Sequence, residues 1–246
     1  MRAAAHAYWR MFVWDIADLR LLLPVLGCVL TLQGAGFVLG IGLFFRHIPE
    51  TAAVFVATGV PVMNLITAGL IFEPQVVADQ RLRGSYDFLW SLPVPRSMMT
   101  LAWYTVTLVV ALPAMVIALL VAVARYGIHF DVSPAIVPAV LLTSLTGVLI
   151  GYAIAHGVTA PMTARLVSIS LFFVLFGFSP IVFPASQLPG WLAAVNQWLP
   201  FGSMATITRA ALVGGEAAGV ARGYLVVAAW AVASALVVAW ALGRRR

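Results

Sequence analysis

The chain has 246 residues, of which 63% are hydrophobic and only 9% are charged, and its mean hydropathy is +1.05. A soluble domain has about a quarter of its residues charged, so this composition excludes an ordinary soluble protein and indicates that lipid surrounds most of the chain. All 14 basic residues are arginines, and the net charge is +6. Because the phosphate-binding loop of most nucleotide hydrolases needs a lysine, we do not expect the chain to hydrolyse ATP by itself.

Residues 2–20 are predicted to form an amphipathic helix that lies in the headgroup plane of the membrane. The two faces of this helix differ in polarity, which is typical of an interfacial helix. One arc of the helical wheel carries Tyr8, Trp9, Phe12, Val13, Ile16 and Leu19, and the opposite arc carries Arg2, His6, Arg10 and Asp18. The alternative is that this segment simply extends the first membrane span.

Six apolar stretches follow, and each is long enough to cross a bilayer, which takes roughly 20 residues. They cover residues 21–45, 51–73, 97–124, 135–156, 165–183 and 220–243. The predicted fold is therefore an all-α integral membrane protein with six spans, in a single domain over residues 1–246. Small residues four positions apart, at Gly36 and Gly40 and at Gly147 and Gly151, predict places where helices approach closely in the membrane.

The arginines indicate the orientation of the spans. With both termini inside, ten arginines are cytoplasmic and four lie outside. The ten are Arg2, Arg10, Arg20, Arg81, Arg83, Arg96, Arg165, Arg244, Arg245 and Arg246, and the four are Arg46, Arg125, Arg209 and Arg222. Short cytoplasmic loops carry an excess of basic residues, so the sequence predicts that both termini are cytoplasmic.

The least apolar stretch in the middle of the chain is RLRGSYDFLWSLPVPR, residues 81–96, in the predicted cytoplasmic segment 74–96. We expect residues 75–90 to form a short helix along the inner membrane surface, broken or bent at Gly84 and Ser85. Its membrane anchors would be Val76, Val77, Tyr86, Phe88, Leu89 and Trp90, and its partner-facing residues would be Asp79, Arg81, Arg83 and Asp87. Pro93 and Pro95 would end it before the third span. The alternative is a basic loop that only sets topology and contacts lipid phosphates.

The stretch 184–215 is too apolar for a solvated loop and too rich in proline and glycine for a single span. One helical face would carry Trp191, Leu192, Val195, Trp198 and Leu199. We therefore expect a pair of short helices that enter the outer leaflet and return, because broken backbone at membrane depth must be covered by protein or line a water-filled cavity.

Ionisable residues are almost absent from the spans, which argues against a proton relay or an ion-coupled transporter. Glu73, at the end of the second span, is interpreted as a solvated boundary carboxylate, with arginine pairing or a role in gating as alternatives. His156, at the end of the fourth span, is interpreted as a packed or interfacial imidazole. Four histidines and a single cysteine, Cys28, make neither a nucleophile with its base nor a metal site, so we predict no catalytic, cofactor-binding or metal-binding residue.

A few neutral polar residues lie inside the spans and are candidates for a translocation path. They are Gln33, Asn64, Thr67 and Thr143. A path lined by such groups would favour an amphipathic or apolar passenger, because it offers hydrogen bonds but no charge. The alternative is that each of them only binds one helix to the next.

This arrangement resembles the membrane subunit of type-2 ATP-binding-cassette exporters along essentially the whole chain. Two local patterns carry the resemblance, one in the cytoplasmic segment and one in the outer hairpin. The first is made by Asp79, Arg81, Arg83, Gly84, Ser85, Asp87, Phe88, Leu89, Leu92, Pro93 and Arg96. The second is made by Phe183, Pro184, Leu188, Pro189, Trp191, Leu192, Asn196, Leu199, Pro200 and Arg209. The chain departs from the family pattern at Ser85, where Thr is usual, and at Asp87, where Glu is usual.

The resemblance implies a coupling segment that docks in a groove of a separate ATPase subunit. The implied coupling residues are Asp79, Arg81, Arg83, Gly84, Asp87, Phe88 and Leu89, and the implied re-entrant hairpin has Trp191, Asn196, Pro200 and Arg209. The resemblance also implies two ATPase subunits that bind ATP and Mg, a second permease subunit (a copy or a sister), contact with membrane lipid and no nucleic-acid partner. We expect export of a drug-like molecule or lipid across a bacterial plasma membrane; the alternative is an ATP-independent facilitator or a channel-like protein.

Overall fold

The computed structural model describes residues 2–44, 49–214 and 217–243 and is all helical over these residues. Six helices are long and apolar enough to cross a membrane. They are α2 (Leu22–Phe44), the continuous helix from α3 to α4 (Glu50–Arg83), α6 (Arg96–Tyr126), α7 (Ile136–Gly157), α8 (Pro161–Phe178) and α11 (Ala217–Gly243). The predicted fold class is therefore confirmed. Phe45, Arg46, Arg244, Arg245 and Arg246, which the span and orientation predictions use, lie outside the described residues.

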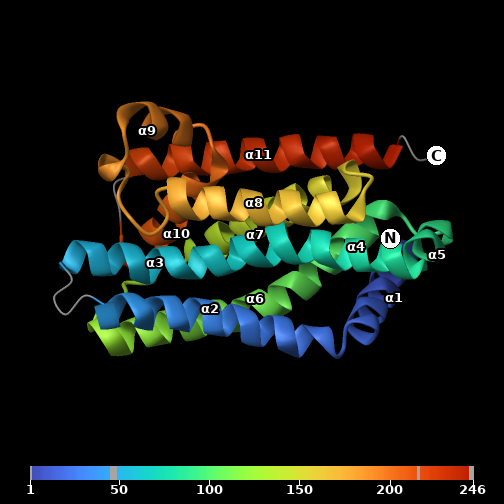
Figure 1. The fold of residues 1–246 in the computed structure, drawn as a ribbon, viewed down its shortest axis with the longest axis horizontal. Coiled ribbons are helices and arrows are strands. Elements are labelled where there is room, and N and C mark those ends of the chain that lie inside the picture. The colour runs from blue at the N-terminus through green and yellow to red at the C-terminus, as the bar shows by residue number, and fades with distance from the viewer. Residues whose placement is uncertain (1, 45–48, 215–216, 244–246) are drawn as a thin grey trace.

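The long helices lie roughly side by side along the long axis of the molecule (Figure 1). Their directions alternate along the chain, so α1 (Arg2–Asp18), α5 (Ser85–Ser91) and the last turn of α11 lie at one end of the bundle. We call this the termini end. The short helix α9 (Gly190–Asn196) marks the opposite end, which we call the hairpin end.

The second long helix extends far beyond its expected boundary. It comprises α3 (Glu50–Thr67), a π-helical turn η1 (Ala68–Phe72) and α4 (Glu73–Arg83) without interruption. The π-helical turn ends two residues before Pro74, which has no N–H to donate to the preceding turn and whose ring would clash with it. A wider turn relieves that conflict without ending the helix.

The expected short helix over residues 75–90 is therefore wrong in its first half, because residues 75–83 prolong the second span. The break falls at Gly84, whose φ of 76° lies in the left-handed region that glycine adopts without strain. A separate short helix, α5, follows, and an extended stretch ending at Pro95 leads into α6. The break at Gly84 and the stop before the third span are thus where the sequence indicated.

The centre of the bundle is held by glycines on two helices. Gly69 of η1 lies against the backbone of Gly147 and Val148 on α7, and Gly151 lies against the carbonyl of Gly69. A Cβ atom on Gly69 or Gly151 would collide with backbone, so the two helices meet at the distance that only glycine permits. By contrast, a Cβ atom on Gly36 or Gly40 of α2 would meet no atom within 4 Å.

Helix α1 packs on α6 and is separated from α2 by a turn at residues 19–21, so it does not extend the first span. Only part of its predicted apolar arc faces the protein: Leu19 is buried, and Tyr8 and Phe12 pack against the core. Trp9, Val13 and Ile16 are exposed, whereas Met11 and Asp15 are buried. The predicted helix is present at residues 2–18, and its Asp15 carboxyl group points into the bundle.

The segment between α8 and α11 forms two short helices, as the sequence predicts. A 3-10 turn, η2 (Ala185–Gln187), leads into α9, and α10 (Pro200–Val213) follows. Helix α10 packs among α3, α7 and α11, whereas the tryptophans Trp191 and Trp198 project from the hairpin end with most of their surface exposed.

Candidate functional site

Residues 79–91 comprise the end of α4, the break at Gly84 and the whole of α5, and they lie at the termini end. We call this segment the elbow. The Asp79 carboxylate forms an ion pair with Arg165 of α8 and lies 3.7 Å from the Arg83 guanidinium. Arg81 donates hydrogen bonds to the carbonyl oxygens of Val158 and Thr159, at 2.7 and 3.1 Å. The elbow is therefore fixed to α8 and to the connection between α7 and α8 by groups of its own chain.

Only part of the predicted coupling set lies on the surface. Arg83, Gly84, Asp87 and Phe88 are exposed, and the Phe88 side chain is 59% exposed. Leu89 packs inward, and Asp79 and Arg81 bind α8 and the α7–α8 connection, so Arg81 does not face outward as the sequence suggested. Leu82, beside Arg83, is 70% exposed and is not among the predicted coupling residues.

Helix α5 is held on α7 by an aromatic cluster around His156. The Tyr86 hydroxyl and His156 Nδ1 lie 2.9 Å apart, and the ring of Tyr152 packs against the imidazole with a centroid distance of 4.1 Å. The interpretation of His156 as a packed imidazole agrees with this geometry. Movement of α5 would consequently be transmitted to α7.

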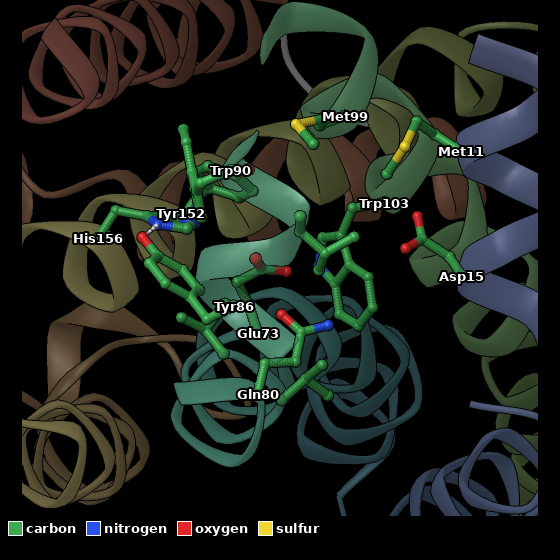
Figure 2. Close-up of a pocket in the computed structure, with 13 residues that line it drawn as sticks. Met11, Asp15, Glu73, Gln80, Tyr86, Trp90, Met99, Trp103, Tyr152 and His156 are labelled. Carbon is green, nitrogen blue, oxygen red and sulfur yellow. Dashed lines mark hydrogen bonds between the residues drawn. The ribbon is translucent and has the colours of Figure 1, made fainter. Parts of the chain in front are cut away.

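A small cavity, which we call the acidic cavity, lies between α1, α4, α5, α6 and α7 (Figure 2). Asp15 of α1 and Glu73 of α4 line it, and the indole of Trp103 from α6 lies between them in this view. Glu73 is only 2% exposed, so the interpretation of a solvated boundary carboxylate is wrong. Burial and the negative charge of nearby Asp18 raise the pKa of Asp15 from 3.8 to about 7.

A carboxyl oxygen and an indole nitrogen of this cavity have no hydrogen-bond partner among the described residues. They are Glu73 Oε2 and Trp103 Nε1, both buried. Neither Asp15 nor Glu73 forms an ion pair within the described part of the chain. Sequence reasoning placed Glu73 at a boundary and did not single out Asp15 or Trp103, because the cavity exists only once α1 folds back on α6.

The predicted path residues are divided between two helix contacts. Gln33 of α2 donates to Thr67 Oγ1 of α3 at 3.0 Å, and Asn64 donates to the carbonyl of Ala114 on α6 at 3.3 Å. Thr143, fully buried on α7, has no hydrogen-bond partner for its hydroxyl among the described residues. Gln33 and Thr67 thus come together, and their bond has the geometry of an interhelical contact.

Gln33 also lines an apolar cavity of about 240 Å³ between α2, α3 and α8. We call it the phenylalanine cavity, because its lining residues are Gln33, Phe37, Val60, Met63, Phe172, Phe173 and Phe176. The sequence drew attention to the one polar residue of this set. Phenylalanines within apolar spans carry no signal of their own, so they were missed.

The hairpin is tied to the bundle by Arg209 and Asn196. Arg209 donates to Thr58 Oγ1 at 2.9 Å and to the carbonyl of Ile181 at 2.7 Å, and its guanidinium lies 3.9 Å from the ring centroid of Phe55. Asn196 donates to the carbonyl of Phe178 at 2.8 Å, at the end of α8. Of the other predicted hairpin residues, Pro200 is buried at the start of α10, and Trp191 is exposed.

The six long apolar helices define a multi-pass membrane protein. At one end of the bundle, the polar elbow is bonded to α8 and to the α7–α8 connection. The family model described as ABC-2 family transporter protein matches residues 34–240, which include both the elbow and the hairpin. The chain therefore belongs to the ABC-2 transporter family. It is the membrane subunit, or permease, of an ABC transporter, a class that works together with an ATPase subunit. A comparison with curated proteins gives no match.

Proposed function

We propose that this permease exports an amphipathic molecule, drug-like or lipid, with energy from two ATPase subunits that bind ATP and Mg and dock on the elbow. The chain itself is non-catalytic in this proposal. It sits in a bacterial plasma membrane with both termini in the cytoplasm, so the termini end is the inner end. The observation that carries the proposal is the elbow, which exposes a mixed polar and apolar surface at the end where α1 begins and α11 ends.

The elbow is suited to transmit force because it continues a membrane helix directly. The helix from Glu50 to Arg83 has 34 residues and is about 50 Å long at 1.5 Å per residue. A push on Leu82 or Arg83 acts on this rod directly, whereas Asp87 and Phe88 lie on α5, beyond the break at Gly84. The bonds from Asp79 to Arg165 and from Arg81 to Val158 make α8 and the end of α7 follow the same movement.

The phenylalanine cavity supports the proposed passenger class. Its walls are aromatic and aliphatic, and Gln33 supplies its polar side-chain group. Such a site binds apolar or amphipathic molecules by surface contact and orients them through a few hydrogen bonds. The neutral character of Gln33, Asn64, Thr67 and Thr143 along the predicted path agrees with a passenger that is not held there by charge.

The exposed side of α2 supports the proposal that a second permease subunit binds there. A Cβ atom on Gly36 or Gly40 would meet no neighbour within the chain, and small residues on a lipid-facing helix permit close approach of another helix. The proposed complex therefore contains two permease subunits, identical or sister chains.

The proposal is tested by reversing the charge of Arg83, which is exposed and whose ion pair with Asp79 is supplemented by Arg165. In cells that also produce the cognate ATPase, Arg83→Glu should reduce both copurification of the ATPase and ATP-dependent efflux by about tenfold or more, as loss of a central interface residue does. Arg10→Glu is the matched control, since Arg10 is an exposed arginine of α1 at the same end.

Efflux that continues without any ATPase subunit would contradict the proposal and favour the facilitator alternative. Unchanged copurification in Arg83→Glu, Asp87→Lys and Phe88→Ala alike would remove the docking role of the elbow.

A further inference from the structure

We propose that the acidic cavity binds a primary ammonium group, the head of a cationic amphiphile or of an amine-bearing lipid. The inference names the class of molecule that the proposed exporter recognises near its inner end, so its role in transport rests on the proposed function. The binding itself is a property of this chain and can be measured without ATP.

The two carboxyl groups of the cavity favour a cationic ligand. Asp15 and Glu73 bring two carboxyl groups to one cavity, and neither forms an ion pair within the described residues. Burying an ionised carboxylate without a partner is strongly unfavourable, so the ionised form needs a cation from outside the chain. Arg81 and Arg96 lie over the rings of Tyr86 and Trp90, which line the cavity, but neither arginine is itself among the lining residues.

The walls of the cavity suit an organic ammonium better than a metal ion. The Trp103 indole lies between the two carboxylates in Figure 2, and an aromatic face attracts a cation. Met11 and Met99 also line the cavity, and their polarizable, apolar side chains would contact the first methylene groups of an alkyl chain. Among the described residues there is no group of three or more His, Cys, Asp and Glu that could hold a metal ion.

Two hydrogen-bonding groups without a partner, on two different helices, indicate that the cavity binds a polar group. Glu73 Oε2 on α4 lacks a donor and Trp103 Nε1 on α6 lacks an acceptor. An ammonium group donates to the carboxylate, and a water that it brings, or an oxygen of its own molecule, accepts from the indole. The cavity has a volume of about 50 Å³ and is partly open, so it has room for a small polar group such as an ammonium head.

The test is isothermal titration of the full-length permease in phosphatidylcholine nanodiscs with n-hexylammonium, n-hexanol and n-hexanoate. These probes share one alkyl chain and differ in charge. We expect saturable binding of n-hexylammonium and weaker or no saturable binding of the other two. Equal binding of hexanol and hexylammonium would show a purely apolar site and overturn the proposal.

The variants Glu73→Gln and Asp15→Asn keep the side-chain shape and remove one charge each. Each should weaken hexylammonium binding about tenfold or more, because a charge-assisted hydrogen bond is lost. Asp131→Asn is the control, since Asp131 is an exposed carboxylate in the connection between α6 and α7 and does not line the cavity, and it should bind as the unaltered chain does. Unchanged affinity in both Glu73→Gln and Asp15→Asn would overturn the proposal, and having two variants guards against one failing to fold.

Nanodiscs that also contain phosphatidylethanolamine distinguish the two sources of the ammonium group. If the lipid headgroup fills the cavity, this lipid weakens hexylammonium binding to the unaltered chain; if a free amphiphile is the ligand, it does not. Absence of saturable hexylammonium binding in lipid free of ethanolamine overturns the inference while leaving ATP-dependent efflux, measured separately, as the test of the proposed function.

Discussion

Arg209 and Asp15 are two charged side chains that enter the bundle from short helices and meet different surroundings. The guanidinium of Arg209 bonds to Thr58 Oγ1 and to the carbonyl of Ile181 and packs on Phe55. Asp15 forms no ion pair among the described residues and instead shares a cavity with a second carboxyl group, Glu73. A buried charge that is satisfied contributes to the fold, whereas one that is not satisfied makes stability depend on pH.

The Asp15 carboxyl should make the free energy of unfolding fall as pH rises from about 4 to about 7. Its pKa is 3.8 without burial and about 7 in the folded chain, so the folded state holds the proton more tightly and loses this advantage as the proton leaves. Above about pH 7 the contribution is constant. Other titratable groups at the cavity or beside Asp15 are Asp18 on α1, Glu73 on α4, Tyr86 on α5 and Tyr152 and His156 on α7.

The measurement is the difference in free energy of unfolding between Asp15→Asn and the unaltered chain in one detergent, from pH 5 to pH 8. We expect the variant to gain relative stability with rising pH and to level off near pH 7. The exposed Asp18→Asn should show a flatter difference. A difference that does not vary with pH would contradict the raised pKa of Asp15.

At the scale of helices, the contact between η1 and α7 depends on the absence of side chains. A Cβ atom on Gly151 would collide with the carbonyl of Gly69, and neither backbone can move without displacing its helix. Gly151→Ala should therefore lower the free energy of unfolding by about 1–3 kcal/mol, the usual cost of overpacking. Gly36→Ala is the matched control in a long helix, because its Cβ meets open space within the chain.

Thermal unfolding of both variants in detergent, with the permease kept monomeric, measures this contrast. Equal stability of Gly151→Ala and the unaltered chain would show that the close approach of the two helices is not what the structure describes.

The sequence predicted most of the helices because apolar length is a local property. The six spans and the hairpin follow from runs of apolar residues and from proline and glycine, and the break at Gly84 follows from the residue type. The continuation of α3 into α4 was missed because residues 73–83 are polar enough to suggest a separate surface helix. They remain in one helix because Val76 and Val77 are buried, which no local pattern reveals.

The predictions about individual site residues were less complete, because a side chain's role depends on distant partners. Asp79 and Arg81 have the composition of a docking surface, but Arg165 lies 86 residues from Asp79 and Val158 lies 77 residues from Arg81. Asp15 is a candidate binding residue because it lines one cavity with Glu73 and Trp103, which the sequence alone does not show. Arg209 and Asn196 were recognised as hairpin residues, whereas their bonds to α3 and α8 required the structure.

For the whole molecule, the two ends of the bundle should differ in their access to reagents. In a Cys28→Ser background, Phe88→Cys at the termini end should react with a membrane-impermeant maleimide only in inverted vesicles. Trp191→Cys at the hairpin end should react only in intact cells, because both side chains are exposed but lie at opposite ends. Addition of the ATPase subunit should protect Phe88→Cys and leave Trp191→Cys unchanged.

Labelling of both cysteines from the same side would contradict the six-span arrangement. Labelling of Phe88→Cys from outside the cell would reverse the proposed orientation and remove the elbow from the reach of any cytoplasmic ATPase.

The π-helical turn at Ala68–Phe72 sets the direction in which the elbow leaves the bundle. One residue in an α-helix corresponds to a rotation of about 100°. Shortening this turn by a single residue would swing α4 around its axis by that angle and carry Asp79 and Arg81 away from α8 and the α7–α8 connection. The length of this turn therefore fixes the rotation of the elbow about the helix axis relative to the membrane-spanning part, so we expect deletion of one residue here to disrupt the contacts of Asp79 and Arg81.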